Sequence, residues 1–230
     1  MNLFNNDDVV MIDGWQCPDE SGALLLTMPN IPAPLHGLNP RSVMGDEEWD
    51  KQRFECYGNA MWKCEICQTP CERMQAHELY TYNYISHTAI FNRLIAVCDK
   101  CHRAIHSGRL VTMTKEGDVS KEYFLDVAEH CFKLIHDYNE AHGTDYRLYN
   151  AFLCAAKNPE IGEQISELIE KYNIKFYRTP RVKPREWKDW KLVWGNKILR
   201  SQYTSAEEWE NQMVIQKQND YMRNGALAQA

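Results

Sequence analysis

Four cysteines form two C-x-x-C pairs, Cys64 with Cys67 and Cys98 with Cys101, separated by 30 residues. Each pair can make a tight knuckle that directs two thiolates at one point, and two knuckles complete the tetrahedral sulfur shell that suits Zn²⁺. A shell made only of cysteines leaves no place for water, so the spacing predicts a structural zinc ion that contributes folding free energy. Two alternatives stay open: redox-active or coincidental cysteines, and replacement of one ligand by the nearby Cys71.

Two histidines follow the second pair, His102 directly and His106 four residues later. On a helix these positions share a face, so both imidazoles can reach one metal ion. Because sulfur already fills the zinc shell, the pattern predicts a second ion. A facing strand should supply a third ligand, and His77 and Glu78 lie in such a strand, on opposite faces unless it bends. Alternatively, His102 and His106 are outer or capping groups of the zinc knuckle.

The order of these motifs resembles the HNH endonucleases of the ββα-metal type. It consists of a C-x-x-C pair, an Ala-His-Glu strand and then C-x-x-C-H-x-x-x-H, within residues 60–110, under a quarter of the chain. The flanks NPRSVMGDEEWDKQR and IHSGRL are similar to uncharacterised HNH proteins of bacteriophages and bacteria. The resemblance implies hydrolysis of DNA phosphodiester bonds by a phage- or mobile-element-encoded protein.

The resemblance also implies roles for individual residues. By position, His77, His102 and His106 would hold the catalytic ion, and Glu78 would stand where the family has a histidine as general base. Glutamate has an ordinary pKa of about 4.3 against about 6.5 for histidine, so it is the weaker base at neutral pH. A shifted alignment would make His77 the base, but it would put Ala76, which cannot bind metal, in the ligand position.

A second departure concerns the asparagine that orients the base in the family. In this chain Arg93 occupies the position of that asparagine, and the adjacent Asn92 is the candidate to take over its role. Arg93, Arg103 and Arg109 are candidates for holding a flanking phosphate. Imidazole ligands leave Mg²⁺, Mn²⁺, Ni²⁺ and Zn²⁺ open as the second ion.

A basic segment near the C-terminus is a second indication of nucleic acid. Residues 175–200 contain nine Lys or Arg and two acidic residues, a net charge of +7, although the whole chain carries −6. Trp187, Trp190 and Trp194 are interleaved with the charges, as in sites that combine phosphate contact with stacking. The alternative is a hairpin whose tryptophans form core and whose charges face solvent. The predicted contacts are Arg181, Lys183, Arg185, Lys188 and Lys191, together with Arg103 and Arg109.

The composition limits the class of protein. The 230 residues are 44% hydrophobic and 25% charged, as in a globular protein. No apolar run approaches the roughly 20 residues that cross a bilayer, and the first residues lack a secretory signal pattern. We therefore expect a cytoplasmic protein (host cytoplasm if phage-encoded) without a membrane partner. Nine cysteines, an odd number, favour metal binding over a disulfide framework.

The elements that must position these residues follow from periodicity and capping signals. We expect helices over 45–59, from Cys98 onward, over 120–143, 147–157 and 158–173, and from Ser205, whose partner Glu208 makes a capping box. Strands are expected on both sides of the first cysteine turn, at 93–98 and 174–178, and in a hairpin with Gly195-Asn196 at its turn. Residues 28–40, rich in proline, predict an arm lying on the core, with a plain linker as the alternative.

Together these features predict an α+β protein. A zinc-stabilised, HNH-like ββα-metal module over 45–117 would follow an N-terminal extended arm, 1–44, and precede a helical region with a basic, Trp-rich hairpin, 118–230. We expect a metal-dependent HNH-like endonuclease acting on DNA. The alternative is a catalytically inactive zinc module that binds nucleic acid or a host protein, for example as an inhibitor. The sequence leaves the oligomeric state open.

Overall fold

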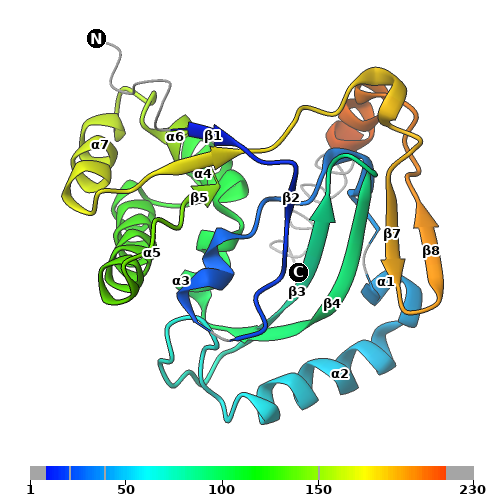
Figure 1. The fold of residues 1–230 in the computed structure, drawn as a ribbon, viewed down its shortest axis with the longest axis horizontal. Coiled ribbons are helices and arrows are strands. Elements are labelled where there is room, and N and C mark those ends of the chain that lie inside the picture. The colour runs from blue at the N-terminus through cyan, green and yellow to red at the C-terminus, as the bar shows by residue number, and fades with distance from the viewer. Residues whose placement is uncertain (1–8, 21, 39, 150, 216–230) are drawn as a thin grey trace, which may run out of the picture.

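The computed structural model describes residues 9–20, 22–38, 40–149 and 151–215. The fold is α+β, which confirms the predicted class, with two sheets and helices packed against them (Figure 1). Residues 1–8 and 216–230, parts of the predicted terminal regions, lie outside the described residues. Within the described part of the chain, no helix is both long and apolar enough to cross a membrane.

The larger sheet has the strand order β2-β3-β4-β7-β8. Its strands are β2 (Gly14–Trp15), β3 (Gln75–Asn83), β4 (Thr88–Val97), β7 (Lys191–Trp194) and β8 (Lys197–Arg200). All neighbouring strands are antiparallel except β4 and β7, which run parallel. The predicted hairpin is confirmed, with Gly195 at a positive φ of 54° in its turn. Its pairing with β4 adds the basic segment to the sheet that carries His77.

The smaller sheet is parallel and joins distant parts of the chain in the order β1-β6-β5. These strands are β1 (Val9–Met11), β5 (Leu148–Tyr149) and β6 (Phe176–Arg178). Figure 1 shows this sheet beside α5 and α7, on the opposite side of the molecule from β7 and β8. The phenylalanines on α5 and β6 are fully buried between these elements, so the predicted helical region has its own part of the core.

The helices and short 3-10 turns complete the architecture. They are η2 (Ala23–Thr27), η3 (Ala33–Leu35), α1 (Pro40–Met44), α2 (Asp46–Asn59), α3 (Asp99–Ile105), α4 (Ser107–Glu116), α5 (Lys121–His142), α6 (Ala151–Ala155), α7 (Gly162–Lys171) and η4 (Pro184–Glu186). Residues 206–215 are also helical, and Ser205 caps them by accepting from the backbone N–H of Glu208 at 3.2 Å. This confirms the predicted start of the last helix.

Helix α5 follows its sequence signals closely. The Ser120 hydroxyl accepts from the Tyr123 backbone N–H at 3.2 Å, and Gly143 ends the helix in the left-handed conformation at φ 62°. The face formed by Phe124, Phe132 and neighbouring apolar residues is buried. Burial of such side chains contributes about 1.5–3 kcal/mol each, so packing holds this helix in place. The same packing places His130 of α5 beside the cysteine cluster.

Three expected elements differ in extent. Residues 147–157 divide into β5 and α6, because Leu148 pairs with Phe176 of β6. Helix α7 begins at Gly162, not at Asn158, whose side chain instead accepts from the Glu160 N–H at 2.8 Å in the preceding turn. Of the two strands expected around the first cysteine turn, the second is confirmed as β3, whereas residues 61–71 contain only a single bridge between Lys63 and Pro70.

The proline-rich arm lies on the core, as predicted. Met28 and Leu35 are buried, and the Tyr177 hydroxyl donates to the Thr27 carbonyl at the start of the arm. The Trp15 indole N–H donates to the Thr27 hydroxyl at 3.1 Å. The plain-linker alternative is therefore excluded, and the arm forms one wall of the cavities described below.

Candidate metal centres

The two C-x-x-C pairs come together in space. Cys64 and Cys67 lie in a tight turn closed by backbone bonds from Cys64 to Thr69 and from Gln68 to Cys64, at 2.9 and 2.8 Å. Cys98 caps helix α3 and Cys101 lies in its first turn, so the end of β4 and the start of α3 position the second pair. A further backbone bond of 2.8 Å from the Glu65 N–H to the Ala96 carbonyl fixes the first turn against β4.

The geometry of this cluster fits zinc. The four Sγ atoms lie within 4.8 Å of one another, and those of Cys67 and Cys98 are 3.8 Å apart. A tetrahedral site with Zn–S bonds of about 2.3 Å has sulfur atoms about 3.8 Å apart. Hydrogen bonding from Cys101 lowers the pKa of Cys64 to about 6, whereas hydrogen bonding to Cys64 raises the pKa of Cys101. The four thiols therefore share protons, and a bound cation can take the place of those protons.

Cys71 and His130 lie near the four cysteines, and only His130 contacts one of them. The Cys71 thiol donates to the Arg73 carbonyl at 3.0 Å and is not part of the group, so the alternative in which it replaces a ligand is not supported. His130 of α5 places its Nε2 3.4 Å from the Cys101 Sγ. Nothing in the local sequence around His130 indicates this contact.

Three histidines make a second cluster. His77 comes from β3, whereas His102 lies on α3 and His106 links α3 to α4 with a backbone bond to the His102 carbonyl of 3.1 Å. Their ring nitrogens lie within 4.8 Å of one another, and the ring centroids of His77 and His106 are 4.8 Å apart. The i, i+4 spacing thus brings two imidazoles to one face, and the folded hairpin supplies the third, as predicted.

The protonation states suit metal binding. His77 is only 5% exposed, and its Nε2 is buried without a hydrogen-bond partner among the described residues. Burial, with the nearby His106 and His102, holds the pKa of His77 well below its ordinary value. Burial also lowers the pKa of His102 and of His106 to about 4. Three neutral imidazoles at pH 7, one with an unused buried nitrogen, form a set of donors that a divalent ion would satisfy.

His77 and His106 open into a cavity of about 540 Å³, called here the histidine cavity. Its walls are the arm, the tyrosine face of β3 and the helix junction, and they include His77, Glu78, His106 and Arg109. Strand alternation alone would separate His77 from Glu78, yet both line it, next to a β-bulge between Leu79 and Tyr80. Burial raises the pKa of Glu78. Its carboxylate is not part of the histidine group, so it lies beside that cluster and not in it.

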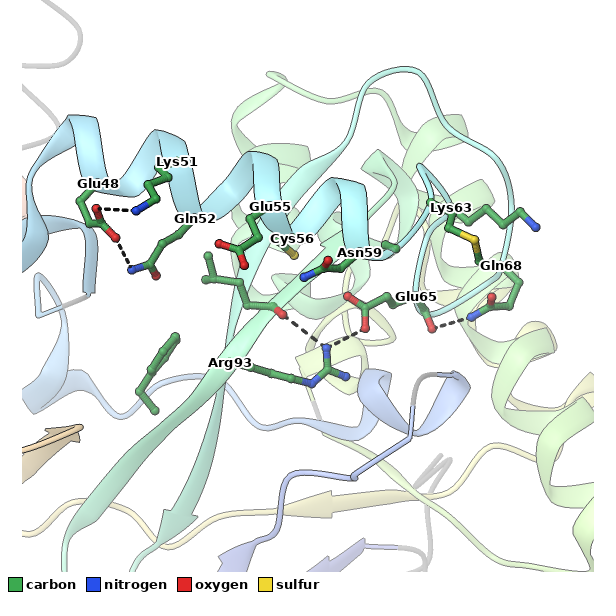
Figure 2. A pocket seen from close by; sticks show the side chains of 14 residues that line it. Glu48, Lys51, Gln52, Glu55, Cys56, Asn59, Lys63, Glu65, Gln68 and Arg93 are labelled. Atoms are coloured by element: carbon green, nitrogen blue, oxygen red, sulfur yellow. Dashed lines mark hydrogen bonds and ion pairs between the residues drawn. The ribbon is translucent and has the colours of Figure 1, made fainter.

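Asn92 and Arg93 lie elsewhere. Asn92 is the exposed extra residue of the β4 bulge. Arg93 donates to Glu65 at 2.6 Å and to the Leu94 carbonyl at 3.3 Å, in a separate cavity of about 600 Å³ under α2. Figure 2 shows Arg93 reaching from β4 toward Glu65 below that helix. Neither residue lines the histidine cavity, so the tertiary structure does not bring them to the three histidines.

The residues predicted to contact nucleic acid are dispersed over the structure. Arg109 lines the histidine cavity, but Arg103 turns toward Asp99 at 3.5 Å and the Met113 sulfur at 3.4 Å. Arg181 and Lys183 line a neighbouring cavity. Outside these cavities, Arg185 and Lys188 are exposed and Lys191 is half-buried on β7.

The tryptophans of the basic segment belong mostly to the core. Trp190 is 1% exposed and packs its ring against Tyr84 and His87, and Trp187 is buried near Trp209. Neither can stack on a base, so for these two the core interpretation holds. Trp194 is half-buried, and the Lys197 ammonium lies over its ring, 5.0 Å from the ring centroid.

Comparisons with protein-family models, with curated proteins and with solved structures gave no match to this chain. The four-cysteine cluster and the three-histidine group therefore stand on their geometry alone.

Proposed function

We propose that this protein is a metal-dependent, HNH-like endonuclease that hydrolyses DNA phosphodiester bonds. The observation that carries the proposal is the three-histidine group, whose ring nitrogens lie within 4.8 Å of one another; two of its members, His77 and His106, line a cavity that Glu78 and Arg109 also line. The class of cation is open among Mg²⁺, Mn²⁺, Ni²⁺ and Zn²⁺. We infer a structural role for the four-cysteine cluster, with Zn²⁺ as its ion.

The order of elements supports the proposal. β3 and β4 form an antiparallel hairpin and α3 follows β4 directly, which is the order of strands and helix in a ββα-metal module. The cysteine cluster lies at the start of α3 and the histidine pair at its end. A zinc ion held by the cysteines would therefore fix the helix that presents the second site.

The chain's own residues would divide the chemistry between them. Glu78, with its raised pKa, would accept a proton from the attacking water, because a base whose pKa lies nearer the working pH transfers protons more effectively. Arg109 would hold phosphoryl oxygens by charge-assisted hydrogen bonds. When bound to the histidines, a divalent ion supplies charge stabilisation for the phosphoryl group and the leaving oxygen.

The test is nicking of supercoiled plasmid by protein stripped of exchangeable metal and then given each of the four ions in turn. We expect at least one ion to restore nicking, and His77→Ala and His106→Ala to abolish it. His106 is partly exposed, so its variant should keep the wild-type melting temperature even if the His77 variant does not. His136→Ala, on the part of α5 that packs against Tyr172, is the matched control. Nicking that survives both cavity variants would overturn the proposal.

A non-catalytic zinc module that binds nucleic acid or a host protein is the second candidate. The position of Arg93 favours it, because this residue pairs with Glu65 and leaves the orienting role of the family's asparagine unfilled. This alternative predicts one tightly held Zn²⁺ per chain and no second ion. A second, exchangeable ion that restores cleavage would exclude it.

A further inference from the structure

A second cavity adjoins the histidine cavity and shares Asn30 and Ile31 of the arm with it. It measures about 730 Å³ and is called here the basic cavity. Its walls come from the arm, from Tyr84 and Tyr149, and from the segment that follows β6. Of the described residues that line it, none is acidic and three are basic: Arg178, Arg181 and Lys183. A cavity with this lining suits an anion.

The two arginines are free to bind. The Arg178 backbone is fixed, because β6 pairs with β1 and the Arg178 carbonyl accepts from the Ile12 N–H at 3.0 Å. The side chains of Arg178 and Arg181 are exposed, and within the described part of the chain neither forms an ion pair. Lys183, in contrast, lies 3.4 Å from Glu186. A guanidinium on a fixed strand end is well placed to bind phosphate in a bidentate manner.

A buried hydroxyl provides a second observation. Tyr84 is 6% exposed, and its hydroxyl makes no hydrogen bond in the described structure, with Thr179 as its polar neighbour on the cavity wall. Buried polar groups in folded proteins almost always have a partner. A phosphoryl oxygen in the basic cavity would be a suitable acceptor for this hydroxyl group.

The two cavities lie along one face of the same chain segment. Glu78, Tyr80 and Tyr82 alternate along β3 and line the histidine cavity, and Tyr84 follows at the next alternate position and lines the basic cavity. At about 3.3 Å per residue, Tyr84 lies about 20 Å from Glu78. That distance spans a few phosphates of one strand of duplex DNA, which advance by about 3.4 Å along the axis and also rotate around it.

We propose that the basic cavity binds a backbone phosphate of the DNA strand whose scissile phosphate lies in the histidine cavity, a few nucleotides along that strand. The inference rests on the proposed function and adds a subsite to it. Arg178 and Arg181 hold the phosphate, and the Tyr84 hydroxyl donates to it. Because this anchor lies on one side of the histidines only, the DNA must extend farther on that side of the cut.

The test is fluorescence anisotropy with a labelled DNA duplex of about 20 base pairs, long enough to span both cavities, and protein without added divalent ion. Arg178→Gln/Arg181→Gln should weaken binding about tenfold or more at low salt. It should also reduce the slope of log K against log salt by about 0.9, the contribution of the one phosphate that the two arginines neutralise. The matched control is Arg73→Gln/Lys133→Gln, which makes the same change in net charge at exposed sites outside both cavities. Equal melting temperatures of the two double variants establish that folding is unaffected.

The outcomes separate the subsite from the nuclease. If both double variants bind equally well while plasmid nicking still needs His106, the subsite is wrong and the proposed function stands. If the cavity variant alone loses binding and His106→Ala still binds DNA, the subsite is supported whether or not nicking is seen. Inorganic phosphate should compete only at millimolar concentrations; full competition at lower concentration, or tighter binding of an RNA duplex than of DNA, would overturn DNA as the ligand.

Discussion

The Cys101 Sγ lies 3.4 Å from the His130 Nε2, so a long helix far along the chain contacts the cysteine cluster. An imidazole N–H that donates to a metal-bound thiolate spreads its negative charge and fixes its orientation. His130 therefore joins α5 to the cysteine cluster at the start of α3, and its removal should weaken metal binding there.

We expect His130→Ala to weaken zinc retention about tenfold, the lower end of the effect typical of groups that support metal ligands. Competition with a chromophoric chelator measures this directly. His136→Ala, on the same helix but edge-on to Tyr172, is the control and should retain zinc like the wild type. Equal chelator midpoints for the two variants would mean that the contact has no influence on the metal.

The four-cysteine cluster should be needed for folding. Cys64→Ser should lose the bound zinc and unfold at lower temperature, because Cys64 is fully buried and binding free energy at such a site is folding free energy. Cys71→Ser removes a thiol outside the cluster and should keep one zinc per chain. Metal analysis and thermal melting check both variants, and a Cys64→Ser protein that retains its zinc would contradict the assignment.

Stability without the second ion should depend on pH through the histidines. The pKa of His102 and of His106 is lowered to about 4 by burial, against an ordinary value of 6.5. Between about pH 6.5 and 4 the unfolded chain binds more protons, so the free energy of unfolding falls as the pH falls through this window and is fully retained above it. Chemical denaturation at several pH values should show this slope, and His102→Gln/His106→Gln should reduce it. The difference between the two proteins isolates these histidines from acid loss of zinc.

The base position makes a separate prediction about rate. If Glu78 must be ionised, nicking should fall as the pH drops through its pKa, which burial raises above its ordinary value. Glu78→Gln should slow nicking by about 10²–10⁴-fold. Glu78→His should retain activity with the acidic limb moved toward the pKa of histidine. Glu72→Gln, at an exposed position, is the control. A glutamine variant as fast as the wild type would exclude Glu78 as the base.

Arg93 should behave as a structural residue. It donates to Glu65 at 2.6 Å, and Glu65 also accepts from the Ala96 N–H at 2.9 Å, so the pair holds the first cysteine turn against β4. We expect Arg93→Ala to lower the free energy of unfolding by about 1 kcal/mol, a value discounted for the partial exposure of the arginine. Nicking at saturating metal should be unchanged. A large loss of rate at unchanged stability would instead restore the orienting role for this position.

The sequence by itself determined the local parts of this protein. The spacing of the C-x-x-C pairs and the i, i+4 histidines required only short-range geometry, and the cap and periodicity of α5 held because local signals and burial agree there. The hairpin turn at Gly195 was equally local. Local rules erred at 147–157, where pairing of Leu148 with β6 overrode the helical pattern.

Tertiary structure decided everything that depends on which surfaces meet. The sequence could not tell that β4 pairs with β7, that Trp190 is core, or that His130 reaches Cys101, because these contacts join residues far apart in the chain. It could not tell either that His77 and Glu78 line one cavity despite strand alternation, since that cavity is enclosed by the arm and the helix junction as well as by β3. The basic cavity has the same origin: the parallel pairing of β1 with β6 brings Arg178 beside the arm, and spacing in the sequence carries no trace of that pairing.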